Sequence, residues 1–246
     1  MDPQTFFDPP DKTASFDNTN WFTVRQAGSV ASSQTDAARA RLCQSYWYPI
    51  YFYIRRLGHG AEDAQDLTQE FFARIFHKNY LQSADSDKGK FRSFLLTMLK
   101  HFMADEWDWA HRQKRGGGAE ILSLDAQDTE FRYRTEPADE STPEKAFERR
   151  WAASVLEHAL ERLKDEYLAA GKARLFEELK PFLMCDSEIS CAEAAQKLEL
   201  TESNVKVTVH RLRHRCRELV RAEIAGIGAS PAQVEEEIRD LFAALA

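Results

Sequence analysis

The chain has 246 residues, of which 43% are hydrophobic and 30% charged, and its formal net charge is -7 at pH 7. A chain of this length and apolar content can bury one sizeable core or two small ones, which excludes collagen-like, mucin-like and wholly disordered proteins. The N-terminal residues carry acids and prolines where a signal peptide would need a basic start and an apolar core, and no apolar run approaches the ~20 residues of a membrane span. We therefore expect a soluble, cytoplasmic protein that does not contact membranes.

Cysteine usage and motif content exclude several kinds of site. The four cysteines are scattered, with no CxxC pair and no histidine at zinc-ligand spacing, so we expect neither a disulfide framework nor a structural zinc. Walker loops, HExxH motifs and nucleophile motifs are also missing from the sequence. We expect no catalytic residues, no metal and no cofactor.

The pattern of apolar residues divides the chain into five segments. Residues 1–20 are predicted to be disordered, and from 21 to 115 the apolar residues recur at helical spacing. Residues 116–143 combine a glycine cluster, prolines and mostly acidic charge, which predicts a flexible linker. A second helical block spans 144–227, and residues 228–246 form a C-terminal amphipathic helix. The predicted fold is all-α, with two small helical domains joined by the linker.

The first helix with a distinctive surface is predicted in GAEDAQDLTQEFFARIF, residues 60–76. Its apolar side chains share one face, and its acids and Gln69 share the other. The clustered carboxylates allow three interpretations: a solvated face, a metal site for phosphoryl transfer, or a docking surface for a basic partner. Like charges four residues apart mildly destabilise such a helix, so the cluster costs some stability.

The next helix is predicted in FRSFLLTMLKHFMADEWDWAHRQKR, residues 91–115. One face is apolar and should be core, while cations and one tryptophan, Trp107, fall on the opposite face. An exposed aromatic among cations can stack an unpaired base while the cations follow the phosphate backbone. The alternative is that Trp107 packs against a neighbouring helix of its own domain. The residues of this polar face are Lys100, Trp107, His111 and Lys114, extended by Arg112 and Arg115.

Residues 190–219 have the pattern of two helices separated by a tight turn. Ser190 and Glu193 form a capping box, and Thr201 can cap the second helix. The second helix buries residues at three- and four-residue steps and presents cations in VKVTVHRLRHRCREL, although the chain as a whole is acidic. This favours DNA binding by a helix-turn-helix, and the alternative is a solvated basic helix. Glu199 occupies the turn position where glycine is usual.

The C-terminal helix is predicted to begin at Pro231, with Ser230 as its N-cap. Its apolar face would be exposed if the segment stood alone, so we expect it to pack on one of the two domains or on a partner. The residues of this face are Val234, Ile238, Leu241, Phe242 and Leu245.

Three stretches make the chain similar to a bacterial RNA polymerase sigma factor of the sigma-70 family, in its extracytoplasmic-function class. AEDAQDLTQEFFARIF resembles the family's polymerase-binding helix, and FRSFLLTMLKHFMADEWDWAHRQKR resembles its melting and -10 recognition helix. SCAEAAQKLELTESNVKVTVHRLRHRCRELV resembles its -35 reading domain. The resemblance implies that residues 21–115 correspond to sigma region 2 and residues 144–227 to sigma region 4.

The resemblance also implies partners and site residues. It implies a factor without catalytic activity that binds the β′ clamp helices and β flap of core RNA polymerase and directs transcription initiation at promoter DNA. The linker would thread polymerase channels. Whether an anti-sigma protein binds is left open.

The implied polymerase-binding residues are Asp66, Gln69 and Glu70. The implied -10 residues, where strands separate, are Lys100, Trp107, His111, Arg112, Lys114 and Arg115. The implied -35 residues are Ser203, Lys206, Val207, His210 and Arg211.

Two other functions fit parts of the sequence. A stand-alone helix-turn-helix regulator would bind operators through residues 144–227 without polymerase. A nuclease would use Asp63, Asp66 and Glu70 to hold a divalent ion. The sequence also departs from the sigma pattern, because KARLFEELKPFLMCDSEIS lacks the Leu-Pro start and the arginine-rich helix that usually precede the -35 helices.

Overall fold

The structure, a computed structural model of the chain, describes residues 24, 27–28, 33–77, 80–82, 90–112, 126–135, 142–183, 189–226 and 231–245. Residues 1–20, which the sequence predicts to be disordered, lie outside this part of the chain. All regular elements within the described residues are helices, which confirms the predicted all-α fold. None of these helices is long and apolar enough to cross a membrane.

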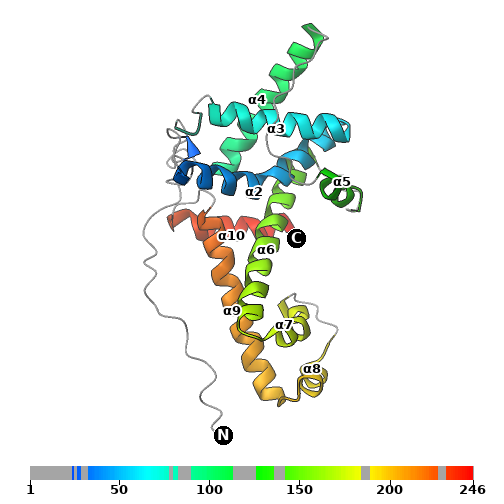
Figure 1. The fold of residues 1–246 in the computed structure, drawn as a ribbon, viewed down its shortest axis with the longest axis vertical. Coiled ribbons are helices and arrows are strands. Elements are labelled where there is room, and N and C mark those ends of the chain that lie inside the picture. The colour runs from blue at the N-terminus through cyan, green and yellow to red at the C-terminus, as the bar shows by residue number, and fades with distance from the viewer. Residues whose placement is uncertain are drawn as a thin grey trace.

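Three helices make up most of the upper part of the molecule (Figure 1), and their buried side chains belong to one apolar core. A turn at Gly58, whose φ is 98°, reverses the chain after the first of them, and a side chain at that position would be strained. A short 3-10 helix, η2 (Tyr80–Gln82), lies between the other two. The three helices are α2 (Ser33–Arg56), α3 (Ala61–His77) and α4 (Phe91–Arg112).

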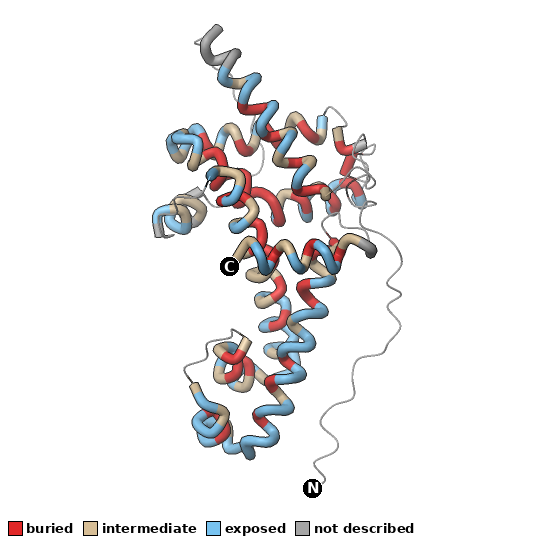
Figure 2. The backbone as a smooth tube through the Cα atoms, turned by 180° about the vertical axis from the view of Figure 1, so that it is seen from behind, coloured by how far each residue is buried: buried red, intermediate tan, exposed pale blue. Residues whose placement is uncertain are grey.

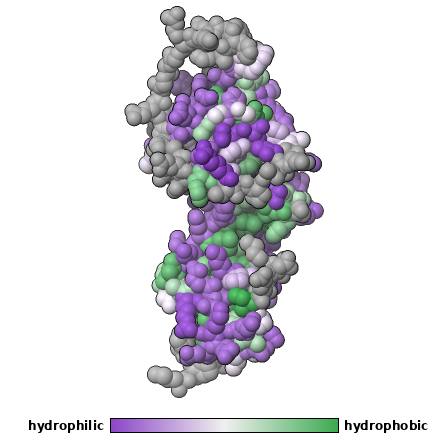
Figure 3. Space-filling view, turned by 90° about the vertical axis from the view of Figure 1, so that its right-hand side faces the viewer, coloured by the Kyte–Doolittle hydropathy of each residue, from purple (hydrophilic) through white to green (hydrophobic). Residues whose placement is uncertain are grey.

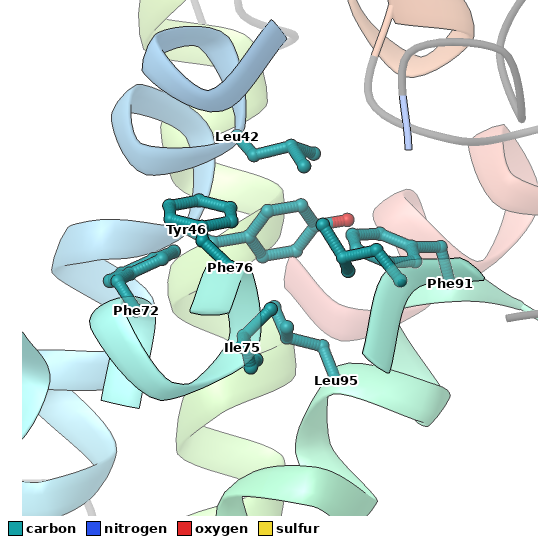
Figure 4. A pocket seen from close by; sticks show the side chains of 8 residues that line it. Leu42, Tyr46, Phe72, Ile75, Phe76, Phe91 and Leu95 are labelled. Carbon is teal, nitrogen blue, oxygen red and sulfur yellow. The ribbon is translucent and has the colours of Figure 1, made fainter. Parts of the chain in front are cut away.

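Aromatic side chains fill the space between these three helices. Trp47 stacks on Phe72 with ring centroids 5.8 Å apart, and Phe71 meets Phe102 edge to face at 5.5 Å. Figure 4 shows Tyr46 and its neighbours converging from α2, α3 and α4 on a small apolar gap of about 10 Å³. A gap of this size holds a single water molecule at most, so it serves packing and not ligand binding.

The lower part of the molecule is a stem of two long helices, which run side by side from the upper part to a foot of shorter helices (Figure 1). The first stem helix begins at Pro143, one residue before the predicted start of the second block, and Thr142 caps it by accepting a hydrogen bond at Oγ1 from the backbone N–H of Lys145. The stem helices are α6 (Pro143–Ala169) and α9 (Glu202–Gly226). The foot contains α7 (Ala173–Leu179), η4 (Lys180–Leu183) and α8 (Cys191–Leu198).

The two parts are joined by direct packing in the described structure. Helix α6 packs along α2, and the fully buried Trp151 and Phe147 of α6 belong to the same core as α2. Figure 2 shows that buried residues run without a break from the upper helices into the top of the stem, while the lower half of α9 is largely exposed. The division at residues 115 and 144 therefore stays a prediction about domains, and in this structure both blocks share one core.

The predicted linker, residues 116–143, contains a helix that the sequence pattern did not indicate. This helix is α5 (Ala126–Thr135), and its Tyr133 packs on Phe52 of α2 with ring centroids 5.2 Å apart. Arg132 of α5 and Arg150 of α6 lie over the ring of Tyr48 at 4.4 and 4.7 Å. These long-range aromatic contacts hold α5 in place. They cannot be predicted from local composition, because the partners lie far away in the sequence.

The C-terminal helix, α10 (Pro231–Leu245), begins at Pro231 as predicted and packs on α6 and α9. Val234 and Leu241 are buried, but the prediction for Phe242 is wrong, because its side chain is 58% exposed. The buried stripe instead includes Glu237, which is only 4% exposed. Steps of three and four residues carry the stripe from Val234 through Glu237 to Leu241, and Phe242 lies about 100° away from it.

Candidate functional site

The acidic face of α3 is presented to solvent by the packing of its opposite face. Ala64, Phe71 and Phe72 are buried against α2 and α4, which leaves Asp66 and Glu70 exposed. Gln69 is half-buried beside them, and Glu62 and Asp63 extend the exposed acidic surface, as predicted. Such a face can attract a basic partner over several ångströms.

Charges on the neighbouring helix reinforce this negative surface. Arg74 at the end of α3 bridges to Asp105 of α4 at 2.6 Å and lies 3.7 Å from Glu106. Burial and the nearby charge of Glu70 raise the pKa of Glu106, although Arg74 opposes the shift. The acidic surface at the end of α3 therefore includes carboxyl groups of α4 as well as those of α3 itself.

The polar face of α4 is described only in part. Trp107 is 64% exposed, which argues against the interpretation that it packs inside its own domain. Lys100 does not point freely to solvent, because its Nζ lies 2.9 Å from Glu144 Oε1 at the start of α6. This hydrogen bond raises the pKa of Lys100 and lowers that of Glu144. The side chains of His111 and Arg112, and the whole of Lys114 and Arg115, lie outside the described residues.

The helix-turn-helix forms from local signals that the sequence predicts. The N–H of Glu193 donates to Ser190 Oγ at 3.2 Å and the N–H of Ser190 donates to Glu193 Oε2 at 2.8 Å, which completes the capping box before α8. Glu199 ends α8 in the left-handed region, with φ 56°. Thr201 Oγ1 then accepts from the N–H of Asn204 at 3.2 Å and caps α9. The turn forms without glycine, at the cost of a positive φ.

The first half of α9 separates a buried face from an exposed one. Val205, Val209 and Leu212 are buried against the foot of the stem. The five residues that the resemblance implies for -35 contacts are all exposed on the remaining surface, which places small and basic side chains together on one side of the helix. These residues are Ser203, Lys206, Val207, His210 and Arg211.

Two arginines of the predicted cationic stripe have structural partners instead. Arg213 Nε donates to the carbonyl of Phe182 at 2.8 Å and fastens α9 to η4. Arg215 makes two hydrogen bonds to Glu166 of α6, at 2.9 and 2.7 Å, and this pairing raises the pKa of the arginine. The stripe available to an external anion is therefore narrower than the sequence indicates.

The charged surfaces lie at separate places on the molecule. The polar face of α4 and the first turns of α9 lie toward opposite ends of the long axis (Figure 1). Figure 3 shows hydrophilic side chains over much of both parts on this side, with apolar side chains gathered at the narrow middle. Among the described residues, no group of three or more His, Cys, Asp or Glu side chains could hold a metal ion.

Sequence reasoning missed two groups of side chains that hold the parts together. One is Glu130 on α5, and the other is the acidic set on α10 that meets Lys90 and Arg92. An acid inside an apolar stripe, Glu237, was the one signal in the sequence that could have indicated the second group.

Comparison with known proteins shows that the chain matches one protein family. The family model described as ECF sigma factor matches residues 54–222, which begin within α2 and end within α9. The match includes α3, α4, the predicted linker and the helix-turn-helix. No curated protein and no solved structure matches the chain.

Proposed function

Because the chain belongs to the ECF sigma factor family, whose members act in transcription initiation with RNA polymerase and promoter DNA as partners, we propose specific roles for its exposed faces. The proposed protein binds core polymerase, reads a -10 and a -35 element, and helps to separate the strands at -10. The single observation that best supports this is the capped helix-turn-helix with its exposed face on α9, on a chain that also exposes an acidic helix. The factor itself needs no catalytic group.

The acidic face of α3 is the proposed contact with the β′ clamp helices, through Asp66, Gln69 and Glu70. Two of these side chains are exposed and the third is half-buried, so a partner can reach them without unfolding the helix. Carboxylates on a rigid helix attract cations and speed association more than they add affinity. The helix-turn-helix end is the proposed contact with the β flap.

The proposed -35 contacts lie on α9. A helix that enters the major groove brings its N-terminal residues to the base edges, and Ser203 and Val207 are small enough to allow that approach. Lys206, His210 and Arg211 supply hydrogen-bond donors to bases and phosphates around them. Because phosphate contacts release counterions from the DNA, binding should weaken as salt rises, and more steeply the more phosphates the protein contacts.

The proposed -10 contacts lie along α4 from Lys100 onward and in the residues that follow it. The exposed ring of Trp107 offers a flat surface on which an extruded base can stack, worth about 1–3 kcal/mol in comparable sites. Lys100, His111, Arg112, Lys114 and Arg115 are the cations proposed to follow the separated strands.

Charge reversal of the acidic face tests the polymerase assignment. The double variant Asp66→Lys and Glu70→Lys should lose core polymerase binding in a gel-filtration or biolayer assay and keep its helical circular dichroism. The control is Glu62→Lys with Asp63→Lys, which makes the same charge change on the exposed first turn of the same helix. Equal loss in both variants would show a general charge effect. Unchanged binding in the first variant, together with tight operator binding by the protein alone, would favour the stand-alone regulator.

A further inference from the structure

A single buried cation joins three segments that are far apart in the sequence. Arg92 of α4 has a side chain that is 6% exposed, and its Nη1 lies 2.6 Å from Glu237 Oε2 while its Nη2 lies 2.5 Å from Asp240 Oδ2, both on α10. Its Nε lies 2.9 Å from Glu148 Oε2 on α6, and its guanidinium stacks over the ring of Trp151 at 4.5 Å. One side chain of the upper part thus holds both α6 and α10.

A second cation beside it extends the same cluster. Lys90 Nζ lies 2.8 Å from Glu236 Oε1 and also pairs with Asp240. Elsewhere Lys100 of α4 pairs with Glu144, the second residue of α6. The stem and α10 are therefore tied to α4 by ion pairs at two places, in addition to their apolar packing.

The ion cluster determines which helix faces meet, and it contributes little net stability. Four acids face two cations, and burial raises the pKa of both Glu148 and Glu237 despite the nearby Arg92. The Nε of Arg92 is buried but lacks hydrogen-bond geometry to any partner within the described residues. Buried ion pairs repay their desolvation only when every group is satisfied, so this cluster fixes the arrangement of the helices without adding much net stability.

The packing of the helices in this structure does not allow the linker to follow the path through polymerase channels that the resemblance implies. Helix α5 lies within residues 116–143, and it docks on α2 through Tyr51, Arg55 and Glu130. For this stretch to thread polymerase channels, α5 must leave α2, and α6 begins only eight residues after α5 ends. Movement of the first turn of α6 away from α4 also frees Lys100, a proposed -10 contact, from Glu144.

We propose that α10 is a latch: it holds the stem against α4 through Arg92 and Lys90 in the free factor, and it releases when core polymerase takes up the linker. This inference rests on the proposed function. The acidic face of α3 and the exposed face of α9 remain accessible in the latched form, so polymerase can make first contact before release. Release costs free energy, and that cost lowers the apparent affinity for polymerase.

The test uses Asp240→Lys in the full chain, with Glu235→Lys as its control. Both variants make the same charge change on α10. Asp240→Lys places a third cation against Arg92 and Lys90, whereas Glu235 pairs only at the surface, with Arg221 at 2.9 Å. We expect Asp240→Lys to bind core polymerase about tenfold more tightly than the wild type, and Glu235→Lys to bind like the wild type. Equal or weaker binding by folded Asp240→Lys would overturn the latch.

Hydrogen exchange on the wild-type protein gives a second, independent readout. Adding core polymerase should slow exchange in α3 and speed it in α5 and α10. If exchange slows in α3 but is unchanged or slower in α10, the latch proposal is wrong and the proposed function is still supported. No polymerase binding at all would remove the proposed function, and the latch with it.

Discussion

The hydroxyl of Tyr51 on α2 donates a hydrogen bond to Glu130 Oε2 on α5 over 2.5 Å, between residues 79 positions apart in the sequence. Arg55 and Arg134 also contact the same carboxylate, at 3.0 and 2.9 Å. Burial alone would raise the pKa of Glu130, but these three partners lower it. A segment predicted as a tether is thus anchored in part at one half-buried carboxylate.

Removing the hydroxyl should loosen α5 selectively. Tyr51→Phe keeps the ring and its edge-to-face contact with Tyr133, and it deletes one hydrogen bond to a charged acceptor, worth about 1.5–3 kcal/mol. We expect the amides of α5 to exchange faster by hydrogen-exchange mass spectrometry, while those of α6 keep their protection. Unchanged exchange in α5 would mean that the aromatic contacts alone hold the helix.

The turn of the helix-turn-helix offers a stability prediction. Glu199→Gly should stabilise the protein by about 0.5–1 kcal/mol, because glycine tolerates the positive φ that Glu199 adopts. This value already allows for the greater conformational entropy of glycine in the unfolded chain, which opposes the gain. The measurement is urea unfolding followed by circular dichroism. Gly171→Ala is the reverse control, since its φ is 69° with open space around it, and it should destabilise by a similar amount. A destabilising Glu199→Gly would show that the glutamate side chain makes a needed contact.

The stem contains a pH-dependent pair. His158 Nδ1 of α6 lies 3.5 Å from Glu223 Oε1 of α9, and the hydrogen bond with Glu223 raises the pKa of His158 above its ordinary value of 6.5. The folded state therefore holds the proton more tightly, and its extra stability is present below pH 6.5 and is lost as the pH rises through the raised value. The melting temperature of the wild type, relative to His158→Gln, should be higher at pH 5.5 than at pH 8.5.

A double-mutant cycle separates this pair from other titrating groups. In a Glu223→Gln background the pH-dependent difference between His158 and His158→Gln should shrink, because the acceptor charge is gone. If the difference survives in that background, another group raises the pKa of His158.

Trp107 gives a prediction about function. The residue is 64% exposed, so Trp107→Ala should leave the fold intact, and it should impair transcription from duplex promoters more than from promoters already opened at -10. Run-off transcription with core polymerase on the two templates measures the ratio. Equal losses on both templates would assign Trp107 a structural role.

Local patterns in the sequence predict much of this protein. The acidic and apolar faces of α3 follow from helical spacing, since residues three and four apart share a face whatever surrounds them. The capping box at Ser190 and Glu193 and the start of α10 at Pro231 depend on neighbouring residues alone, and the structure agrees with them. The motifs that resemble sigma factors lie within these same local elements.

The tertiary structure decided which charged side chains pair with other residues of the chain and which stay available to a partner. Arg213 and Arg215 belong to the cationic stripe by sequence, yet they bind Phe182 and Glu166, which lie 31 and 49 positions away. Composition alone cannot find such partners, because an arginine is equally suited to a phosphate and to a carboxylate of its own chain.

The sequence by itself determined the helical blocks other than α5, the caps at Ser190 and Thr201, and the acidic and basic faces, because these depend on contacts within a few residues. Only the tertiary structure decided that both blocks share a core, that α5 docks on α2, and that Arg92 meets Glu237 across 145 positions. Such contacts depend on how whole helices approach one another, and packing of that kind leaves no fixed spacing in the sequence.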